Sequence, residues 1–211
     1  MSYVLNKSTL EKACRELAGR DSDLAFVYKM YGAPPLWDRP EGFATLLQII
    51  LEQQVSLASA KACFDKLCLR LGKPAPENII RSSDSELRAD GFSRQKSTYA
   101  RHLAEAVVEK RIDLENLKNL TDEEVKSELI KLKGIGEWTS DIYLLMAMLR
   151  PDIMPKGDLA LHIAYQKLTV AENRPGSDEF LLIAEKWKPY RSVAARLLCH
   201  FYLSQKVRQT V

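Results

Sequence analysis

Apolar residues recur at helical spacing along most of this chain of 211 residues. The pattern predicts helices at residues 8–18, 24–31, 43–51, 58–71, 97–110, 121–132 and 137–149. A short helix is predicted to start at Ser83, an apolar run follows Asp158, and two terminal helices follow a loop at 174–177. Residues 34–42 and 71–76 are rich in proline and glycine and predict loops. No run of alternating β-branched residues predicts a strand, so we expect an all-α fold.

The clearest helix boundary lies around a Gly-Ile-Gly turn. Thr121 and Glu124 match a capping box for the helix that leads into it. Gly134 is expected to end that helix, because glycine adopts the positive φ that a helix terminus often needs. Gly136 allows another backbone to approach closely, and a second helix begins at Glu137. The N–H groups at the start of this second helix, together with the helix dipole, suit an anion such as a phosphate.

Charged residues accompany this hairpin. Lys131 and Lys133 add positive charge beside it, and Gly157-Asp158 follows beyond the second helix. Taken alone, a Gly-x-Gly between helices is most often a tight turn, and an aspartate before an apolar run is most often an N-cap. Their combination favours a protein that holds DNA and performs chemistry on it.

Five blocks of sequence, in the same order, resemble the HhH-GPD superfamily of DNA glycosylases, and within it the AlkA-type 3-methyladenine DNA glycosylases. The blocks are residues 43–56, 91–96, 132–139, 157–158 and 187–194. The resemblance implies two helical subdomains with the active site in the cleft between them. One subdomain is expected to combine residues 1–37 with 158–211. The other is expected to span 38–157 and to carry the helix-hairpin-helix at about 121–149. The extra N-terminal α+β domain of AlkA has no counterpart here, so we expect the compact, wholly helical form.

The resemblance also implies roles for single residues. Asp158 is the expected catalytic carboxylate, since a negative charge stabilises an oxocarbenium-like sugar and can orient or deprotonate the attacking water. Trp138 and Tyr190 are expected to form the base pocket, because aromatic faces attract cationic alkylated purines. Gln53 and Gln54 fall in the segment that wedges into the duplex, and AlkA-type enzymes often have an apolar residue in place of Gln54. The alternatives are ordinary packing for both rings and a polar helix end for both glutamines.

The hairpin is implied to bind the DNA backbone through Lys133, Gly134, Ile135 and Gly136. The carbonyls of Ile130, Leu132 and Ile135 are implied to hold a monovalent cation, Na⁺ or K⁺, that bridges to a phosphate.

Lyase-type relatives carry a lysine at the position of Trp138, and that lysine attacks C1′ to form a Schiff base. Tryptophan has no nucleophilic amine, so the chain is expected to be a monofunctional glycosylase that leaves an abasic site. Two alternatives stay open: a non-catalytic helix-hairpin-helix module that binds DNA, and a bifunctional glycosylase/lyase that uses another lysine.

Composition agrees with these expectations. The net charge is only +3, so any DNA-binding face depends on how the charges are distributed. Cys14, Cys63, Cys68 and Cys199 are scattered and contain no C-x-x-C pair. Some relatives in the superfamily that the chain resembles hold an iron–sulfur cluster with four closely spaced C-terminal cysteines, which this sequence does not show, so the resemblance implies no cluster and no required cofactor. Neither a membrane-spanning stretch nor a signal peptide is evident. We therefore expect an intracellular monomer, cytoplasmic in a prokaryote or nuclear in a eukaryote, that binds double-stranded DNA containing alkylated bases.

Overall fold

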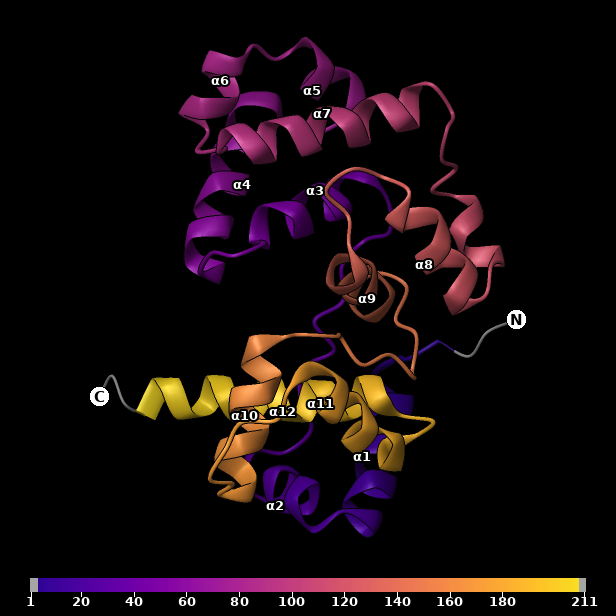
Figure 1. Cartoon of the computed structure of the whole chain (residues 1–211), viewed down its shortest axis with the longest axis vertical. Helices are drawn as coiled ribbons and strands as arrows, with labels where there is room; N and C mark the ends of the chain where they lie inside the picture. Colours follow the sequence, from indigo (N-terminus) through magenta and orange to yellow (C-terminus); the bar gives the residue numbers. More distant parts are fainter. Residues whose placement is uncertain (1–3, 209–211) are drawn as a thin grey trace. The chain divides into compact units, whose positions relative to one another are not determined.

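The computed structural model describes residues 4–208, and within that range every regular element is a helix (Figure 1). The all-α prediction is therefore confirmed. The chain forms two compact units, one made of Met1–Asp38 with Leu144–Val211 and the other of Arg39–Tyr143. Residues 1–3 and 209–211, which belong to the subdomain predicted at 1–37 and 158–211, lie outside the described residues. Between residues 4 and 208, no helix combines the length and the apolar character needed to cross a membrane.

The first unit packs around its C-terminal helix. Its elements are α1 (Lys7–Arg20), α2 (Ser22–Tyr31), α10 (Leu159–Thr169), α11 (Ser177–Ala184), η2 (Glu185–Trp187) and α12 (Arg191–Arg208). Helix α12 contacts α1, α2 and α10. Leu17, Leu24, Phe180, Trp187 and Leu198 are fully buried in the core that these helices share. Burial of each such side chain stabilises the fold by about 1.5–3 kcal/mol.

Asp21 ties the two ends of the chain together in this unit. It caps α2, where its Oδ1 accepts the N–H groups of Asp23 at 3.0 Å and Leu24 at 3.1 Å. Its Oδ2 accepts the Trp187 indole N–H at 2.8 Å and the Lys186 ammonium at 2.9 Å. Burial alone raises the pKa of Asp21, but these hydrogen bonds outweigh it and hold the pKa below its ordinary value. The C-terminal sequence block is thus fixed to the N-terminal helices.

The second unit is built from short helices. They are α3 (Phe43–Glu52), α4 (Leu57–Leu71), α5 (Pro76–Arg81), α6 (Asp84–Ala89), α7 (Arg94–Val108), η1 (Asn116–Asn119), α8 (Asp122–Ile130) and the start of α9 (Glu137–Met146). Helix α7 contacts α3, α5 and α6, and α3 also contacts α4. Leu47, Ile50, Leu67, Leu103 and Val125 are fully buried in this unit.

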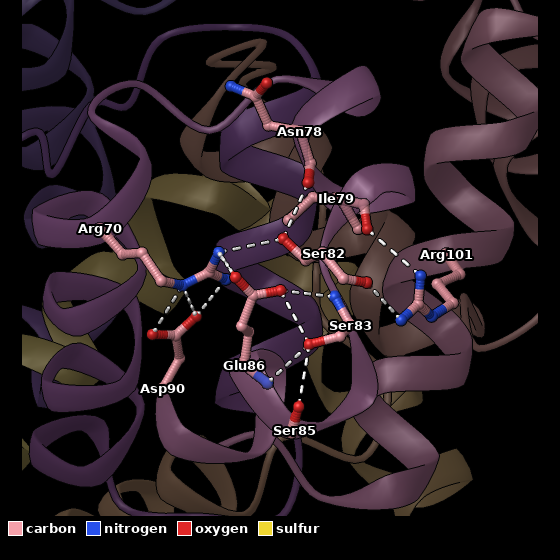
Figure 2. Close-up of polar contacts among 9 residues, drawn as sticks. All are labelled: Arg70, Asn78, Ile79, Ser82, Ser83, Ser85, Glu86, Asp90 and Arg101. Carbon is pink, nitrogen blue, oxygen red and sulfur yellow. Dashed lines mark hydrogen bonds and ion pairs between the residues drawn. The ribbon is translucent and has the colours of Figure 1, made fainter.

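A polar network connects α4 with the segment between α5 and α6 and with α7 (Figure 2). The Arg70 guanidinium binds the Asp90 carboxylate through Nε at 2.9 Å and Nη2 at 2.5 Å. Its Nη1 donates to Ser82 Oγ at 3.1 Å, while Arg101 donates to the Ser82 carbonyl at 2.6 Å. The Arg70 bonds join side chains, whereas the Arg101 bond satisfies a backbone carbonyl at the end of a short helix.

The structure differs from the predicted helices at three places. The sequence predicts a loop up to Pro76 and no helix after it, but Pro76 is the first residue of α5, where its fixed φ and missing N–H are favourable. The helix expected to end at Gly134 ends at Ile130, and Gly134 lies in the turn that follows. Helix α9 ends at Met146, and Leu149 has a left-handed φ of 52°.

The second unit also ends earlier than expected. Residues 144–157 were assigned to the central subdomain, but they belong to the first unit. The Leu5 N–H donates to the Leu149 carbonyl at 2.9 Å, and the Ile153 N–H donates to Ser192 Oγ at 2.9 Å. These contacts with both ends of the chain explain why the segment packs with the first unit.

Candidate functional site

The hairpin begins with the helix that the sequence predicts. The Thr121 N–H donates to Glu124 Oε2 at 2.8 Å, and the Glu124 N–H donates to Thr121 Oγ1 at 3.2 Å. This reciprocal pair confirms the predicted capping box and fixes the start of α8.

The turn between α8 and α9 is tight. The Ile135 N–H donates to the Leu132 carbonyl at 3.0 Å, and Gly134 between them has a φ of 90°. The Ser140 N–H then donates to the Gly136 carbonyl at 3.1 Å, which closes the first turn of α9. Gly134 therefore supplies the positive φ that this reversal requires.

The two hairpin glycines differ in what surrounds them. A Cβ on Gly134 would lie 2.2 Å from Cγ of Tyr99, so the fold itself excludes a side chain there. A Cβ on Gly136 would meet no atom within 4 Å, and Gly136 is exposed. The fold does not need glycine at position 136, which leaves room for another molecule to approach the backbone.

Positive groups gather on this turn. Within residues 4–208, no acceptor is bonded to the backbone N–H groups of Lys133, Gly134 or Gly136. Lys131 forms an ion pair with Glu128 at 2.6 Å, whereas the exposed Lys133 has no ion pair in the described part of the chain. Unbonded N–H groups, a helix N-terminus and a lysine together make a suitable site for an anion.

The two predicted wedge residues have different environments. Gln53 caps the end of α3, and its side-chain amide donates to the Gly134 carbonyl at 2.8 Å and to Thr139 Oγ1 at 2.9 Å. The next residue, Gln54, is exposed and has a left-handed φ of 56°. Gln53 is thus bound to the hairpin, while a wedge role remains a prediction for Gln54.

Three residues without a predicted role support these loops. The Tyr99 ring packs against Gly134, and Thr139 accepts the Gln53 amide. Lys96 donates to the Leu51 carbonyl at 2.6 Å near the end of α3. Lys96 and Thr139 lie in the blocks 91–96 and 132–139 that resemble the family, which was their signal in the sequence, whereas Tyr99 lies outside the blocks.

The carbonyl groups implied to hold a cation suit one chemically. The Leu132 carbonyl accepts one hydrogen bond and keeps a second lone pair, and in the described range no hydrogen bond is made to the carbonyls of Ile130 or Ile135. Carbonyl oxygens can replace the hydration shell of an alkali ion. These three residues therefore fit Na⁺ or K⁺.

Asp158 is the N-cap of α10, in the first unit. Its Oδ1 accepts the N–H groups of Ala160 at 3.0 Å and Leu161 at 3.2 Å, so the cap uses one carboxylate oxygen. The side chain is half-buried. The positive end of the helix dipole favours a negative charge at this place, so capping and an ionised carboxylate are compatible.

The thiol of Cys199 lies in the field of this carboxylate. Burial and, to a smaller extent, the charge of Asp158 raise the pKa of Cys199 to about 11. Cys199 is therefore a neutral thiol at physiological pH and does not act as a nucleophile beside Asp158.

The segment that leads to Asp158 is held by the C-terminal sequence block. Arg191 binds Asp152 in a two-pronged ion pair, with Nε–Oδ1 at 2.9 Å and Nη2–Oδ2 at 3.0 Å. Ser192 Oγ accepts the Ile153 N–H at 2.9 Å and donates to the Ile153 carbonyl at 3.2 Å. Arg191 and Ser192 of this block therefore fix the position of the backbone before α10.

The two predicted pocket residues lie in different units. Trp138 is the second residue of α9 and is half-buried. Tyr190 is also half-buried, packs against the core of the first unit, and donates its N–H to the Trp187 carbonyl at 2.8 Å. Packing thus explains part of the Tyr190 environment, and contact with a base remains a prediction for both rings.

The sequence is similar to those of several known proteins. The family model described as HhH-GPD superfamily base excision DNA repair protein matches residues 47–189. DNA-3-methyladenine glycosylase 1 of Schizosaccharomyces pombe is 31% identical over 196 residues, which cover 89% of this chain and 86% of that protein. The chain spans 64% of the length of YfjP of Bacillus subtilis, to which it is 26% identical.

Solved structures have the same fold. The 3-methyladenine DNA glycosylase Mag1 of Schizosaccharomyces pombe, solved in complex with abasic DNA, superposes with a TM-score of 0.84 at 29% identity. The match covers 92% of this chain and 97% of that chain. A DNA-3-methyladenine glycosidase of Bacillus halodurans superposes with a TM-score of 0.74 at 28% identity and covers 92% and 91% of the two chains.

Proposed function

The chain belongs to the HhH-GPD superfamily of base excision DNA repair proteins, and we propose that it is a monofunctional DNA glycosylase for alkylated bases. Its substrates are lesions of the 3-methyladenine and 7-methylguanine type in double-stranded DNA. It hydrolyses the N-glycosidic bond and leaves an abasic site. The observation that carries this proposal is the occurrence, in one chain of this family, of a tight hairpin turn with an open Gly136 and of a helix-capping Asp158.

The hairpin holds the DNA backbone. The N–H groups near Gly136 and the charge of Lys133 bind a phosphate, and such contacts position the protein without reading sequence. A base inside a stacked duplex is out of reach of a catalytic group, so the damaged nucleotide must be flipped out. The exposed Gln54 fills the gap that the flipped base leaves.

The flipped base is selected by charge. 3-Methyladenine and 7-methylguanine nucleotides carry a positive charge, and an aromatic face attracts a cation by about 0.5–2 kcal/mol. Trp138 provides this face, and Tyr190 is the second candidate. Undamaged bases are neutral and lack this attraction.

Asp158 acts at the sugar. As the bond between C1′ and the base nitrogen breaks, its electron pair goes to the cationic base, which leaves as a neutral molecule. The sugar becomes oxocarbenium-like, and the negative charge of Asp158 stabilises it. Water adds to C1′, and Asp158 orients this water or accepts its proton. No strong general acid is needed for a leaving group that is already cationic.

The reaction needs no Schiff base and no redox cofactor. Trp138 has no amine to attack C1′, and the four cysteines are dispersed along the sequence, so we propose no iron–sulfur cluster. A Na⁺ or K⁺ ion held by the carbonyls of Ile130, Leu132 and Ile135 would add positive charge between the hairpin and a phosphate. The enzyme acts as a monomer in this proposal.

One assay tests the proposal. The protein is incubated with methylated duplex DNA, and released bases are separated by chromatography while alkali-labile sites are counted on a gel. We expect free 3-methyladenine and 7-methylguanine, together with strands that break only after alkali treatment. Binding to the duplex without any base release would instead support a non-catalytic DNA-binding module. Strand breaks without alkali would support a bifunctional lyase.

A further inference from the structure

We propose that Gln53 is a positioning residue that joins the wedge loop to the hairpin, so that the grip on the phosphate and the insertion of Gln54 depend on one side-chain amide. This inference rests on the proposed function, since it concerns how the enzyme holds and opens DNA. It gives Gln53 a role different from that of its neighbour, with which the sequence pattern grouped it.

The Gln53 amide uses both of its N–H groups on the hairpin. One donates to the Gly134 carbonyl at 2.8 Å and the other to Thr139 Oγ1 at 2.9 Å. Thr139 is 2% exposed, so this bond lies away from solvent. A side chain at the end of α3 is thereby attached both to the turn and to the first turn of α9.

The contact with Gly134 fixes the orientation of the central peptide of the turn. The peptide that joins Gly134 to Ile135 is planar, so its carbonyl and its N–H point in opposite directions. Gln53 binds the carbonyl, while the N–H donates to the Leu132 carbonyl at 3.0 Å. Tyr99 packs against the Gly134 Cα region. With this peptide held, the direction of the following Gly136 N–H toward a phosphate is also set.

The same residue holds the base of the wedge loop. The Gln53 N–H donates to the Ile50 carbonyl at 3.3 Å, and Lys96 binds the Leu51 carbonyl just before it. Gln54 then adopts a φ of 56°, which residues other than glycine seldom do. Such a conformation persists only where the surroundings impose it. In this proposal Gln53 imposes the left-handed conformation of Gln54, because the Gln53 side chain is bonded to the hairpin and fixes the backbone directly before Gln54.

Three variants test this role. Gln53→Ala removes both donors without adding charge. Gln48→Ala is the matched control, because Gln48 also lies on α3 but donates to Glu52 at 3.4 Å and makes no bond to the hairpin. Affinity is measured on undamaged duplex DNA, which reports the hairpin grip, and folding is checked by thermal melting. We expect Gln53→Ala to bind about tenfold more weakly, the effect of two lost hydrogen bonds, and Gln48→Ala to bind within about twofold of wild type.

The third variant, Gln53→Glu, separates positioning from simple structural support. An ionised carboxylate cannot donate to the Gly134 carbonyl, but a protonated one can donate a single hydrogen bond. We expect Gln53→Glu to bind the duplex weakly at pH 7.5 and several-fold more tightly toward pH 5. This gain should exceed the gain of Gln54→Glu over the same pH range, and wild type should show no comparable gain. The Gln54→Glu control carries the same charge with no hairpin contact.

Unchanged affinity of folded Gln53→Ala, or no recovery of Gln53→Glu beyond its control, overturns the inference. If Gln53→Ala does not fold, Thr139→Val removes one of the two acceptors at nearly constant volume, and an affinity equal to wild type then overturns it. These results do not depend on base release. Failure of the proposed function would appear separately, as a wild-type protein that binds duplex DNA and releases no alkylated base.

Discussion

Asp158 combines two roles in one side chain, because it caps α10 and carries the charge proposed to act on the sugar. Asparagine is an equally good N-cap, so Asp158→Asn removes the charge and keeps the cap. We expect single-turnover release of 3-methyladenine to fall by about 10²–10⁴-fold, the usual contribution of such a group. DNA affinity and melting temperature should stay close to wild type. Excision within several-fold of wild type would refute the assignment.

Asp21 offers a matched control for this variant. Like Asp158, it caps a helix through one oxygen that accepts two backbone N–H groups. Asp21→Asn should lower stability through its contacts with Lys186 and Trp187, yet the folded variant should release bases at the wild-type rate. Comparing Asp158→Asn with Asp21→Asn distinguishes the effect of removing the charge of a helix cap from the effect of removing the proposed catalytic carboxylate.

The pKa of Asp21 also predicts how stability depends on pH. Because the folded state holds this pKa below its ordinary value, the carboxylate stabilises the fold above the unfolded pKa of about 3.9, and this contribution is lost as pH falls below that value and through the lower folded pKa. We expect wild type to lose stability more steeply than Asp21→Asn between pH 5 and pH 3, measured by urea unfolding at each pH. Parallel curves for the two proteins would contradict this prediction.

Trp138 tests whether the pocket senses charge. Trp138→Ala should slow excision of cationic 3-methyladenine more than excision of neutral hypoxanthine, because only the first loses the attraction of a cation to the ring. The difference should be about 1 kcal/mol, or several-fold in rate if it is realised in the transition state. Single-lesion duplexes under single-turnover conditions measure both rates. Equal losses would make Trp138 a wall of the pocket, and no loss in a folded variant would place it outside the site.

At the scale of elements, the hairpin glycines give a paired prediction. Gly134→Ala forces an alanine into a φ of 90° and against Tyr99, so we expect a loss of about 1–3 kcal/mol in the free energy of unfolding. Gly136→Ala meets no atom of the protein within 4 Å and should leave stability within about 0.5 kcal/mol of wild type. It should nevertheless weaken binding to duplex DNA of any sequence. Unchanged affinity of the Gly136→Ala and Gly136→Val variants would reduce the hairpin to a structural turn.

Helix starts could be predicted from the sequence wherever the determinants are local. The capping box predicted at Thr121 is present, and the helix expected after Ser83 also starts with a capping box, because each depends on residues three positions apart. The end of α8 could not be placed, since the positive φ of Gly134 serves the turn and not the helix terminus. The bond from Gln53 to Gly134 joins residues 81 positions apart, and no periodicity contains such information.

At the scale of the whole molecule, the chain forms two compact units, and residues 144–157 pack with the first of them. Residues 144–146 are the end of α9, which starts in the second unit, and residues 147–157 follow this helix directly. Their partners, however, are Leu5 and Ser192, which lie at opposite ends of the sequence. Only the three-dimensional packing could assign this segment to the first unit.

The absence of a lysine at position 138 leads to the last prediction, which concerns the chemistry of the protein as a whole. Borohydride reduces a Schiff base between an amine and the C1′ aldehyde of an abasic site to a stable covalent link. Wild-type protein incubated with alkylated or abasic DNA and borohydride should therefore yield no covalent protein–DNA band on a denaturing gel.

Trp138→Lys is the matched variant, because it places an amine at the position where the resemblance implies a Schiff-base lysine in lyase-type enzymes. A band for Trp138→Lys alone would show that this position reaches the sugar and that tryptophan keeps the enzyme monofunctional. A band for wild type would mean that another lysine attacks C1′ and would overturn the monofunctional proposal, even if Asp158 proved essential for base release.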